Sequence, residues 1–162
     1  MAEDYNESID SQELKQLVAS ENWDEAFDLL AQPLHIWLNQ EGTFETLADR
    51  TPYEQLILSF DYIQGQIGQG GFIQLIQNGY APLLVVTIES LQQLQMGSEM
   101  VKVLDDALKV YVLNHEALSR ETSVEEFGKL YSEFNEFEAL EVQFTSLRIL
   151  LLIDLVNRIL AK

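Results

Sequence analysis

The chain has 162 residues, which is enough for one domain with a sizeable core, and 47% of them are hydrophobic, which excludes disorder throughout. Its 27 acidic and nine basic residues give a formal net charge of −18, which repels nucleic acids and anionic membranes and attracts basic partners. With no cysteine, the chain can form neither disulfides nor thiolate metal sites, and its acidic beginning does not resemble a secretory signal. We therefore expect a cytoplasmic protein.

The predicted elements in the first third of the chain are helices with recognisable starts. Asp10 and Asn22 are each followed by Glu three residues later, a pattern typical of the first turn of a helix. Pro33 suits the first position of another helix, and Gly42 is expected to end it. The clearest start is Thr-Pro-Tyr-Glu at 51–54, after which apolar residues recur at helical spacing.

A neutral window follows, since no charged side chain lies between Asp61 and Glu89. Glycines at 68, 70 and 71 are expected to break the helix, because glycine weakens helices and admits positive backbone torsions. A short helix is predicted for 72–77, closed by Asn78-Gly79. We assign a structural role to the motif in this window, in which glycines let helices approach, a phenylalanine enters the core and amides bond unpaired backbone: Gln69, Gly70, Gly71, Phe72, Gln74 and Asn78.

The most apolar segment, 83–96, is predicted to be the central helix of the fold. Its β-branched residues at 85–88 leave a short strand as the alternative. Gly97-Ser98 should end this segment and begin the next helix.

A further helix is predicted from Ser123 to Phe144, with Ser123 and Glu126 as its cap. The apolar run that follows it is interrupted by charges and too short for a membrane span, so it is predicted to be a buried terminal helix. We thus expect residues 1–8 to be frayed and 9–162 to form a single all-α domain, a bundle of seven or eight helices around 83–96.

Few residues are candidates for catalysis. The two histidines, His35 and His115, are not part of a Glu-x-x-His pair, and the glycine-rich stretch lacks the Lys-Ser/Thr of a phosphate-binding loop. The sequence has no Gly-x-Ser-x-Gly nucleophile motif. These features predict a non-enzymatic protein with no cofactor and no metal.

The acidic residues are concentrated in two segments, in which basic residues are rare. Residues 1–54 hold thirteen acidic and two basic residues, and 121–141 hold seven acidic residues and Lys129 alone. We predict that these segments bind a basic protein, because such fields speed association; the alternative is a solvated surface that only aids solubility. The residues predicted to contact the partner are Glu125, Glu126, Glu133, Glu136, Glu138 and Glu141, with Asp24, Glu25 and Asp28 as a second patch.

Several stretches resemble a bacterial family of small helical proteins, formerly a domain of unknown function, that includes DNA mimics. The helix start at 51–54 is similar to that of the family, and Gln66-Ile67-Gly68-Gln69-Gly70-Gly71-Phe72 is similar to its Gly-Gly-Phe centre. Residues 74–78 resemble the segment that follows, and Gly97-Ser98 stands where the family has Gly-Ala. The chain departs from the pattern at Gln66, Gln69 and Leu75-Ile76, where the family has Glu, Asn and Tyr-Phe.

This resemblance covers about residues 47–140. It implies an all-α fold, is compatible with a homodimer and, for some members, implies binding to DNA-binding proteins by imitation of duplex phosphates. The shared motif looks structural, so the mimicry would belong to the acidic surface.

Our leading hypothesis is a non-enzymatic DNA mimic that blocks a basic DNA-binding protein. An immunity-type protein that neutralises a basic toxin or nuclease would have the same electrostatics. A third alternative is an enzyme or small-molecule binder that uses polar side chains near the glycine turn: Gln69, Gln74, Asn78, Tyr62 and Tyr80.

Overall fold

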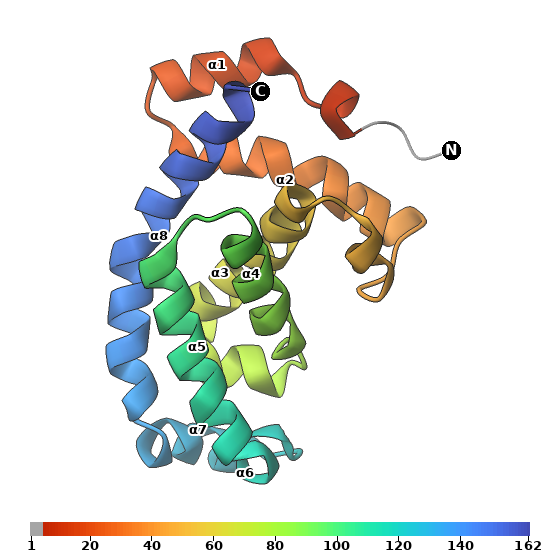
Figure 1. The fold of residues 1–162 in the computed structure, drawn as a ribbon. Helices are drawn as coiled ribbons and strands as arrows, with labels where there is room; N and C mark the ends of the chain where they lie inside the picture. The colour runs from red at the N-terminus through yellow and green to blue at the C-terminus, as the bar shows by residue number, and fades with distance from the viewer. Residues whose placement is uncertain (1–4) are drawn as a thin grey trace.

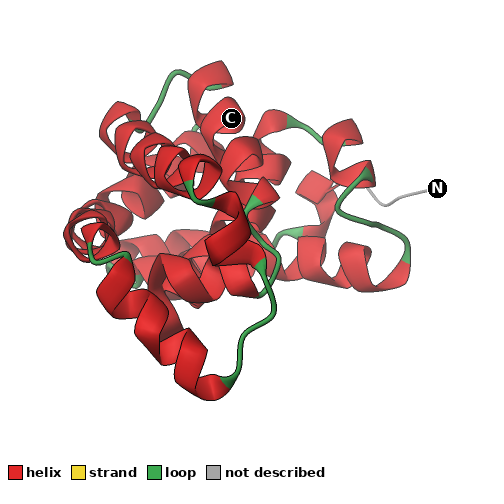
Figure 2. Cartoon of the chain, turned by 90° about the horizontal axis from the view of Figure 1, so that it is seen from below, coloured by secondary structure: helices red, strands yellow, loops and turns green. Residues whose placement is uncertain are grey.

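The computed structural model describes residues 5–162, and within that range it contains eight α-helices, two 3-10 helices and no strand (Figures 1 and 2). The single-domain, all-α prediction is confirmed. In chain order the elements are η1 Tyr5–Ser8, α1 Ser11–Ala19, α2 Trp23–Gln40, η2 Thr46–Asp49, α3 Pro52–Gln77, α4 Pro82–Gln93, α5 Ser98–Leu113, α6 His115–Ser119, α7 Val124–Glu133 and α8 Glu136–Leu160.

The centre of the molecule is formed by α3. The helix α3 packs against α2, α4, α6 and α8, whereas α4 packs against α3 and α5. Between α3 and α4, the buried hydroxyl of Thr87 donates a hydrogen bond of 2.8 Å to that of Ser59. The segment predicted to be the central helix forms α4, which ends at Gln93 and leaves Val85 and Glu89 exposed, so the α-helix with the most α-helical neighbours is α3 instead. The strand alternative at 85–88 is wrong, because these residues are helical.

The longest side of the molecule is spanned by α8, which runs from α7 at one end to α1 at the other (Figure 1). It packs against α2, α3 and α5. Most of its buried side chains belong to the apolar C-terminal run, as predicted. Helices far apart in sequence therefore pack side by side along α8, whereas the acidic segment at 121–141 lies at the end of α8 opposite to α1 (Figure 1).

Several helix starts are formed by the predicted local hydrogen bonds. Thr51 and Glu54 form a capping box, in which the Thr51 N–H donates to the Glu54 carboxylate at 2.8 Å. Ser123 and Glu126 form the same motif at the start of α7. Asp10 accepts bonds from two backbone N–H groups of α1, whereas Asn22 precedes α2 without a side-chain cap bond.

Pro33 does not begin a helix, contrary to the prediction, because it lies inside the continuous helix α2. A proline in a helix interior removes one hydrogen bond and costs about 3 kcal/mol. Leu30, Ala31 and Leu34 surround it and are buried. Burial of these side chains offsets the cost of the proline and keeps the helix continuous. The helix α2 ends at Gln40, before Gly42.

The predicted helix from Ser123 to Phe144 is in fact two helices. The chain leaves helical geometry at Phe134, where φ is −117° and ψ is 50°, and α7 turns away across the end of α8 (Figure 1). Leu130 of α7 and Phe137 of α8 are both buried. The break lets them enter the core from different directions, which a straight helix would prevent.

The prediction that the chain is frayed as far as residue 8 is wrong for residues 5–8. Tyr5–Ser8 form a 3-10 helix, and the buried hydroxyl of Tyr5 donates to the Leu30 carbonyl at 2.7 Å. Residues 1–4 lie outside the described part of the chain. Among the residues described, no single helix is both long and apolar enough to cross a membrane, and α3 with α4 would meet that criterion only as a pair bent by 114°.

Candidate protein-binding surfaces

The glycine turn interrupts α3 at two residues. Gly70 and Gly71 have non-helical torsions, and φ of Gly71 is +73°. A Cβ on Gly71 would lie 2.2 Å from Oε1 of Glu141, so both the torsion and the available space require glycine there. The predicted break is confirmed at these two residues, whereas Gly68 remains helical.

Two side chains from α7 and α8 hold the turn in place. The Phe72 N–H restarts the helix after the break and donates to the Glu141 carboxylate at 3.0 Å, and the Tyr131 hydroxyl donates to the Gly70 carbonyl at 2.6 Å. The ring of Phe72 packs against those of Phe137 and Phe144, with centroids 5.6 and 6.3 Å away. We call these contacts the clamp. They join the glycine turn to α7 and α8.

The clamp changes the environment of Glu141. Burial raises the pKa of its carboxyl, the hydrogen bond from Phe72 acts in the opposite direction, and the charge of Glu138 raises it further. Burial also raises the pKa of the Tyr131 hydroxyl, as does Glu141 to a smaller extent. Glu141, which the sequence predicted to face a partner, is therefore partly buried and bonded to the core of its own chain.

The amides of the motif bond mainly to one another. Gln74 donates to the side-chain oxygens of Gln66 and Gln69 at 3.2 Å, and Asn78 donates to Gln66 at 2.7 Å. The sequence predicts that these amides bond unpaired backbone, whereas Glu141 and Tyr131 make the bonds to the backbone of the turn. Gln77, which the sequence analysis did not select, donates to the carbonyls of Leu118 and Arg120.

The first acidic surface covers α7 and the beginning of α8, and we call it the arm surface. It comprises five exposed residues, Glu125, Glu126, Glu133, Glu136 and Glu138. The Glu125 carboxylate lies 3.5 Å from Lys129 Nζ, and that of Glu126 accepts the Ser123 N–H in the capping box. The three remaining carboxylates have no hydrogen bond or ion pair within the described residues. Two of the predicted contact residues are therefore partly engaged in local structure.

The second acidic surface surrounds a hollow of about 440 Å³ between α1, α2 and α3, which we call the α2 hollow. Glu25 and Asp28 line it, as predicted for the second patch, together with Glu13, His35 and Asp61. Nε2 of His35 lies 2.6 Å from the Asp61 carboxylate. Asp24 lies outside the hollow and forms an ion pair with Arg148, with 2.5 Å between Nη1 and Oδ1.

The crowding of carboxylates at the α2 hollow affects Asp28. Partial burial raises the pKa of its carboxyl, and the charges of Asp61, Asp24 and Glu25 add to the increase, while His35 opposes it. Sequence reasoning missed Glu13 and Asp61 as members of this surface. No signal in the sequence could have revealed them, because they lie on other helices and reach the hollow only through packing.

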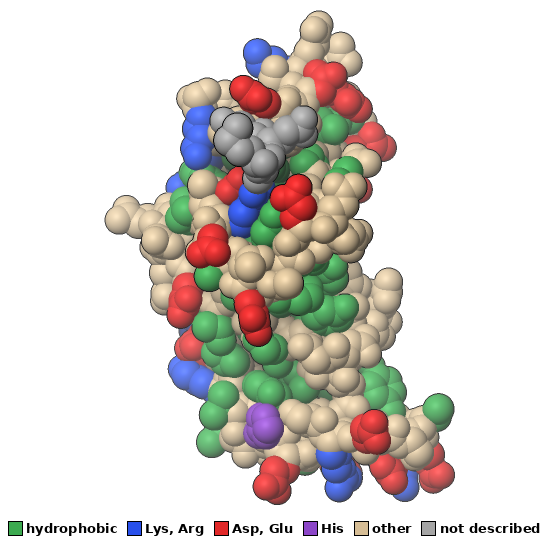
Figure 3. Space-filling model, turned by 90° about the vertical axis from the view of Figure 1, so that its right-hand side faces the viewer, with side chains coloured by type: hydrophobic (Ala, Val, Ile, Leu, Met, Phe, Trp, Pro, Cys, Tyr) green, Lys and Arg blue, Asp and Glu red, His purple; other side chains and the backbone are tan. Residues whose placement is uncertain are grey.

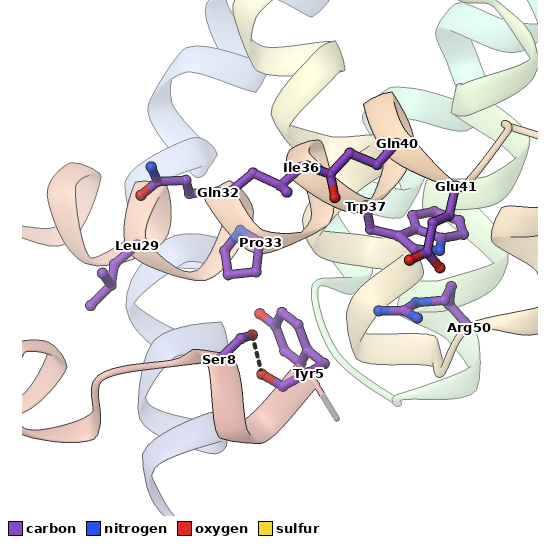
Figure 4. A pocket seen from close by; sticks show the side chains of 10 residues that line it. All are labelled: Tyr5, Ser8, Leu29, Gln32, Pro33, Ile36, Trp37, Gln40, Glu41 and Arg50. Atoms are coloured by element: carbon purple, nitrogen blue, oxygen red, sulfur yellow. Dashed lines mark hydrogen bonds between the residues drawn. The ribbon is translucent and has the colours of Figure 1, made fainter. Parts of the chain in front are cut away.

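A cavity of about 280 Å³ lies between η1, α2 and Arg50 (Figure 4). The Arg50 guanidinium lies over the Trp37 ring, 4.7 Å from its centroid, and 3.4 Å from the Glu54 carboxylate. Burial raises the pKa of Tyr5, whose hydroxyl already donates to Leu30. The polar groups here join η1 and the segment before α3 to α2, so we assign the cavity a structural role. Within the described residues, no group of acidic and histidine side chains has the arrangement of a metal site.

Comparison with known proteins places the chain in a family. The family model for DMP19-like proteins matches residues 48–160, which is more than half of the chain. No curated protein and no solved structure matches it. The matched range includes the glycine turn, the clamp and the arm surface, whereas most of the α2 hollow lies before it. The chain therefore belongs to the family of DMP19-like proteins, the DNA-mimic family that its sequence resembles.

Proposed function

We propose that this protein is a non-enzymatic inhibitor that occupies the DNA-contacting surface of a basic DNA-binding protein. The observation that supports this most strongly is the acidity that the fold leaves uncompensated. Glu133, Glu136 and Glu138 on the arm surface, and Glu25 and Asp28 at the α2 hollow, have no cationic partner in the described part of the chain. Membership of a DNA-mimic family supports the same function.

The mechanism is electrostatic competition. Exposed carboxylates take the place of duplex phosphates opposite lysine and arginine side chains of the partner. The field of a chain with charge −18 accelerates encounter with a basic surface, and dissolved salt screens that field. Binding should therefore weaken steeply between roughly 50 and 200 mM salt, as it does for DNA itself.

The alternative of catalysis at the glycine turn receives no support from the contacts there. The amides of Gln69, Gln74 and Asn78 bond to one another or to Gln66, and Tyr131 and Glu141 bond the backbone of the turn. These groups stabilise the break in α3, and their bonding capacity is used within the fold.

The test uses cellular proteins that have first been retained on immobilised duplex DNA and eluted with salt. This fraction is applied to the immobilised acidic protein at low salt and then challenged either with a salt gradient or with duplex DNA. We expect one DNA-binding protein to be retained, released by moderate salt and displaced by the duplex. Retention that salt does not affect would contradict the electrostatic mechanism. A basic toxin or nuclease that the duplex does not displace would instead favour the immunity function.

A pair of variants identifies the surface involved. Glu133, Glu136 and Glu138 are all replaced by lysine in one variant, and Glu7, Glu89 and Glu99, which are also exposed, in the other. Both variants change the net charge equally. If the arm surface contacts the partner, the first variant loses binding and the second retains most of it. Equal losses would mean that only total charge matters.

A further inference from the structure

Three aromatic side chains from distant parts of the sequence meet at the surface. Phe44 lies in the loop between α2 and η2, Tyr62 in α3 and Tyr80 in the turn before α4. The ring centroid of Phe44 lies 5.3 Å from that of Tyr62 and 6.2 Å from that of Tyr80, and the two tyrosine rings are 5.2 Å apart. We call this group the aromatic cluster. Phe44 is 41% exposed, so part of the cluster remains open to solvent.

The cluster is next to the α2 hollow. The His35 ring packs on Tyr62 with 5.3 Å between centroids, and its Nε2 lies 2.6 Å from the carboxylate of Asp61, which lines the hollow. Burial raises the pKa of Tyr62, and the charges of Tyr80 and Asp61 raise it further, so the field of the hollow reaches the cluster. The face that carries the loop between α2 and η2 shows apolar side chains in its middle, with acidic and some basic side chains around them (Figure 3).

Basic side chains are scarce in this part of the chain. Arg50 is the only basic residue between Lys15 and Lys102, and it is engaged by Glu54 and the Trp37 ring. Arg148 of α8 lies near Asp61 as well, and its guanidinium is paired with Asp24 and bonded to Gln64, so both arginines are already engaged within the chain. Exposed aromatic rings beside carboxylates attract cations, through both the ring quadrupole and the negative field.

We propose that the aromatic cluster, together with Asp61 at the edge of the α2 hollow, binds an arginine side chain of the basic protein partner. This inference rests on the proposed function and adds a contact that is not ionic. The planar guanidinium can stack on an aromatic ring while its N–H groups reach a carboxylate, which suits arginine better than lysine. A nucleic acid is repelled by the surrounding carboxylates, and a second copy of the chain would bring a further charge of −18.

The test measures binding of two labelled peptides by fluorescence anisotropy, one of alternating arginine and glycine and the other of alternating lysine and glycine. We expect the wild type to bind the arginine peptide about threefold more tightly, the size expected for an exposed cation–π contact. Phe44→Ala should reduce that preference to about one. Because this variant removes no charge, the slope of log affinity against log salt should not change.

Two further variants separate the aromatic contact from simple burial. Phe44→Leu keeps an apolar side chain but removes the ring, so it should lose the preference for arginine as Phe44→Ala does. Val112→Ala, an exposed apolar residue on α5, should keep it. Loss of arginine preference in both Phe44 variants supports the proposal, and its persistence in either one overturns it. If neither peptide binds the wild type at low salt, the proposed function fails as well; if both bind and Phe44 has no effect, only this inference fails.

Discussion

The arm surface and the α2 hollow are both acidic, but the fold uses their carboxylates in different ways. In the arm, Glu126 caps α7, Glu125 pairs with Lys129, and Glu141 is drawn inward to the clamp. At the hollow, carboxylates from three helices face a common space, and Asp61 is held there by His35 and by Gln64, whose amide donates to it at 2.9 Å. A dense row of acidic residues in a sequence is therefore no measure of the charge available to a partner.

The two regions also differ in what holds them in place. The arm depends on a turn that requires glycine, because a side chain at position 71 would meet the Glu141 carboxylate that bonds Phe72. The hollow depends on ordinary packing of α1 and α3 against α2. A substitution that breaks the contacts of the clamp should therefore displace the arm surface and leave the α2 hollow unchanged.

The largest expected effect on stability is that of the Gly71→Ala substitution. The variant requires a positive φ in a residue with a side chain and places Cβ 2.2 Å from Glu141, so it should lower the free energy of unfolding by about 2–4 kcal/mol. The matched control is Gly68→Ala, where the structure is helical and no atom lies within 4 Å of the added Cβ. That change should stabilise the protein by up to about 1 kcal/mol. Urea unfolding measures both, and equal effects would contradict the proposed strain at Gly71.

The next largest effect is expected on the free energy of unfolding when Glu141, or its neighbour Glu138, is replaced by alanine. Glu141→Ala leaves the Phe72 N–H without its acceptor and should destabilise the protein by about 1–3 kcal/mol. Glu138→Ala removes the same charge from an exposed position and should change stability by less than about 0.5 kcal/mol. Partner affinity should show a different pattern, because only Glu138 faces outward. Similar stability losses in the two variants would rule out a special role for the clamp.

The third prediction concerns how the stability of the Glu141→Gln variant, compared with that of the wild type, depends on pH. Because the carboxyl has a raised pKa in the folded state, the native protein binds the proton more tightly than the unfolded chain does. The contribution of Glu141 to stability is then full below its ordinary pKa and is lost as pH rises through its folded-state pKa. Glutamine cannot titrate, so the stability of Glu141→Gln relative to wild type should increase as pH rises through that window. Thermal unfolding measures it, and a pH-independent difference would contradict the assignment.

At the α2 hollow, the stability of the Asp28→Asn variant should change with pH in the same direction. Burial and three neighbouring carboxylates raise the pKa of Asp28, so the asparagine variant should also gain stability relative to wild type as pH rises. The gain should shrink at high salt, because much of the carboxyl is exposed and the charges are screened. A gain that high salt does not reduce would show that desolvation alone is responsible.

The smallest expected effect concerns the ion pair of Arg148 with Asp24. Arg148→Gln should lower stability by at most about 1 kcal/mol, since the Asp24 side of the pair is largely exposed. It should also tighten binding of a basic peptide, because a carboxylate beside the α2 hollow is released. The control is Lys109→Gln, whose ion pair with Asp105 lies on α5. If both variants tighten binding equally, the change in net charge explains the result and the hollow is not involved.

Much of the fold could be predicted because it depends on short-range patterns. The caps at Thr51 and Ser123 are formed by side chains that bond to backbone three residues away, so the chain itself brings the partners together. The break at Gly70 and Gly71 follows from the torsions that glycine allows. Pro33 was mispredicted because burial of the surrounding helix outweighed a local preference.

The sequence by itself determined the all-α class, the acidity and the position of the glycine break, since composition and local hydrogen bonding decide these properties. Only the tertiary structure decided which carboxylates remain available. It turned Glu141 toward Phe72, split the predicted acidic helix at Phe134, and brought Glu13 and Asp61 to the hollow beside α2. The physical reason is that these contacts join side chains from different helices, whose relative positions are set by burial of apolar surface across the whole core.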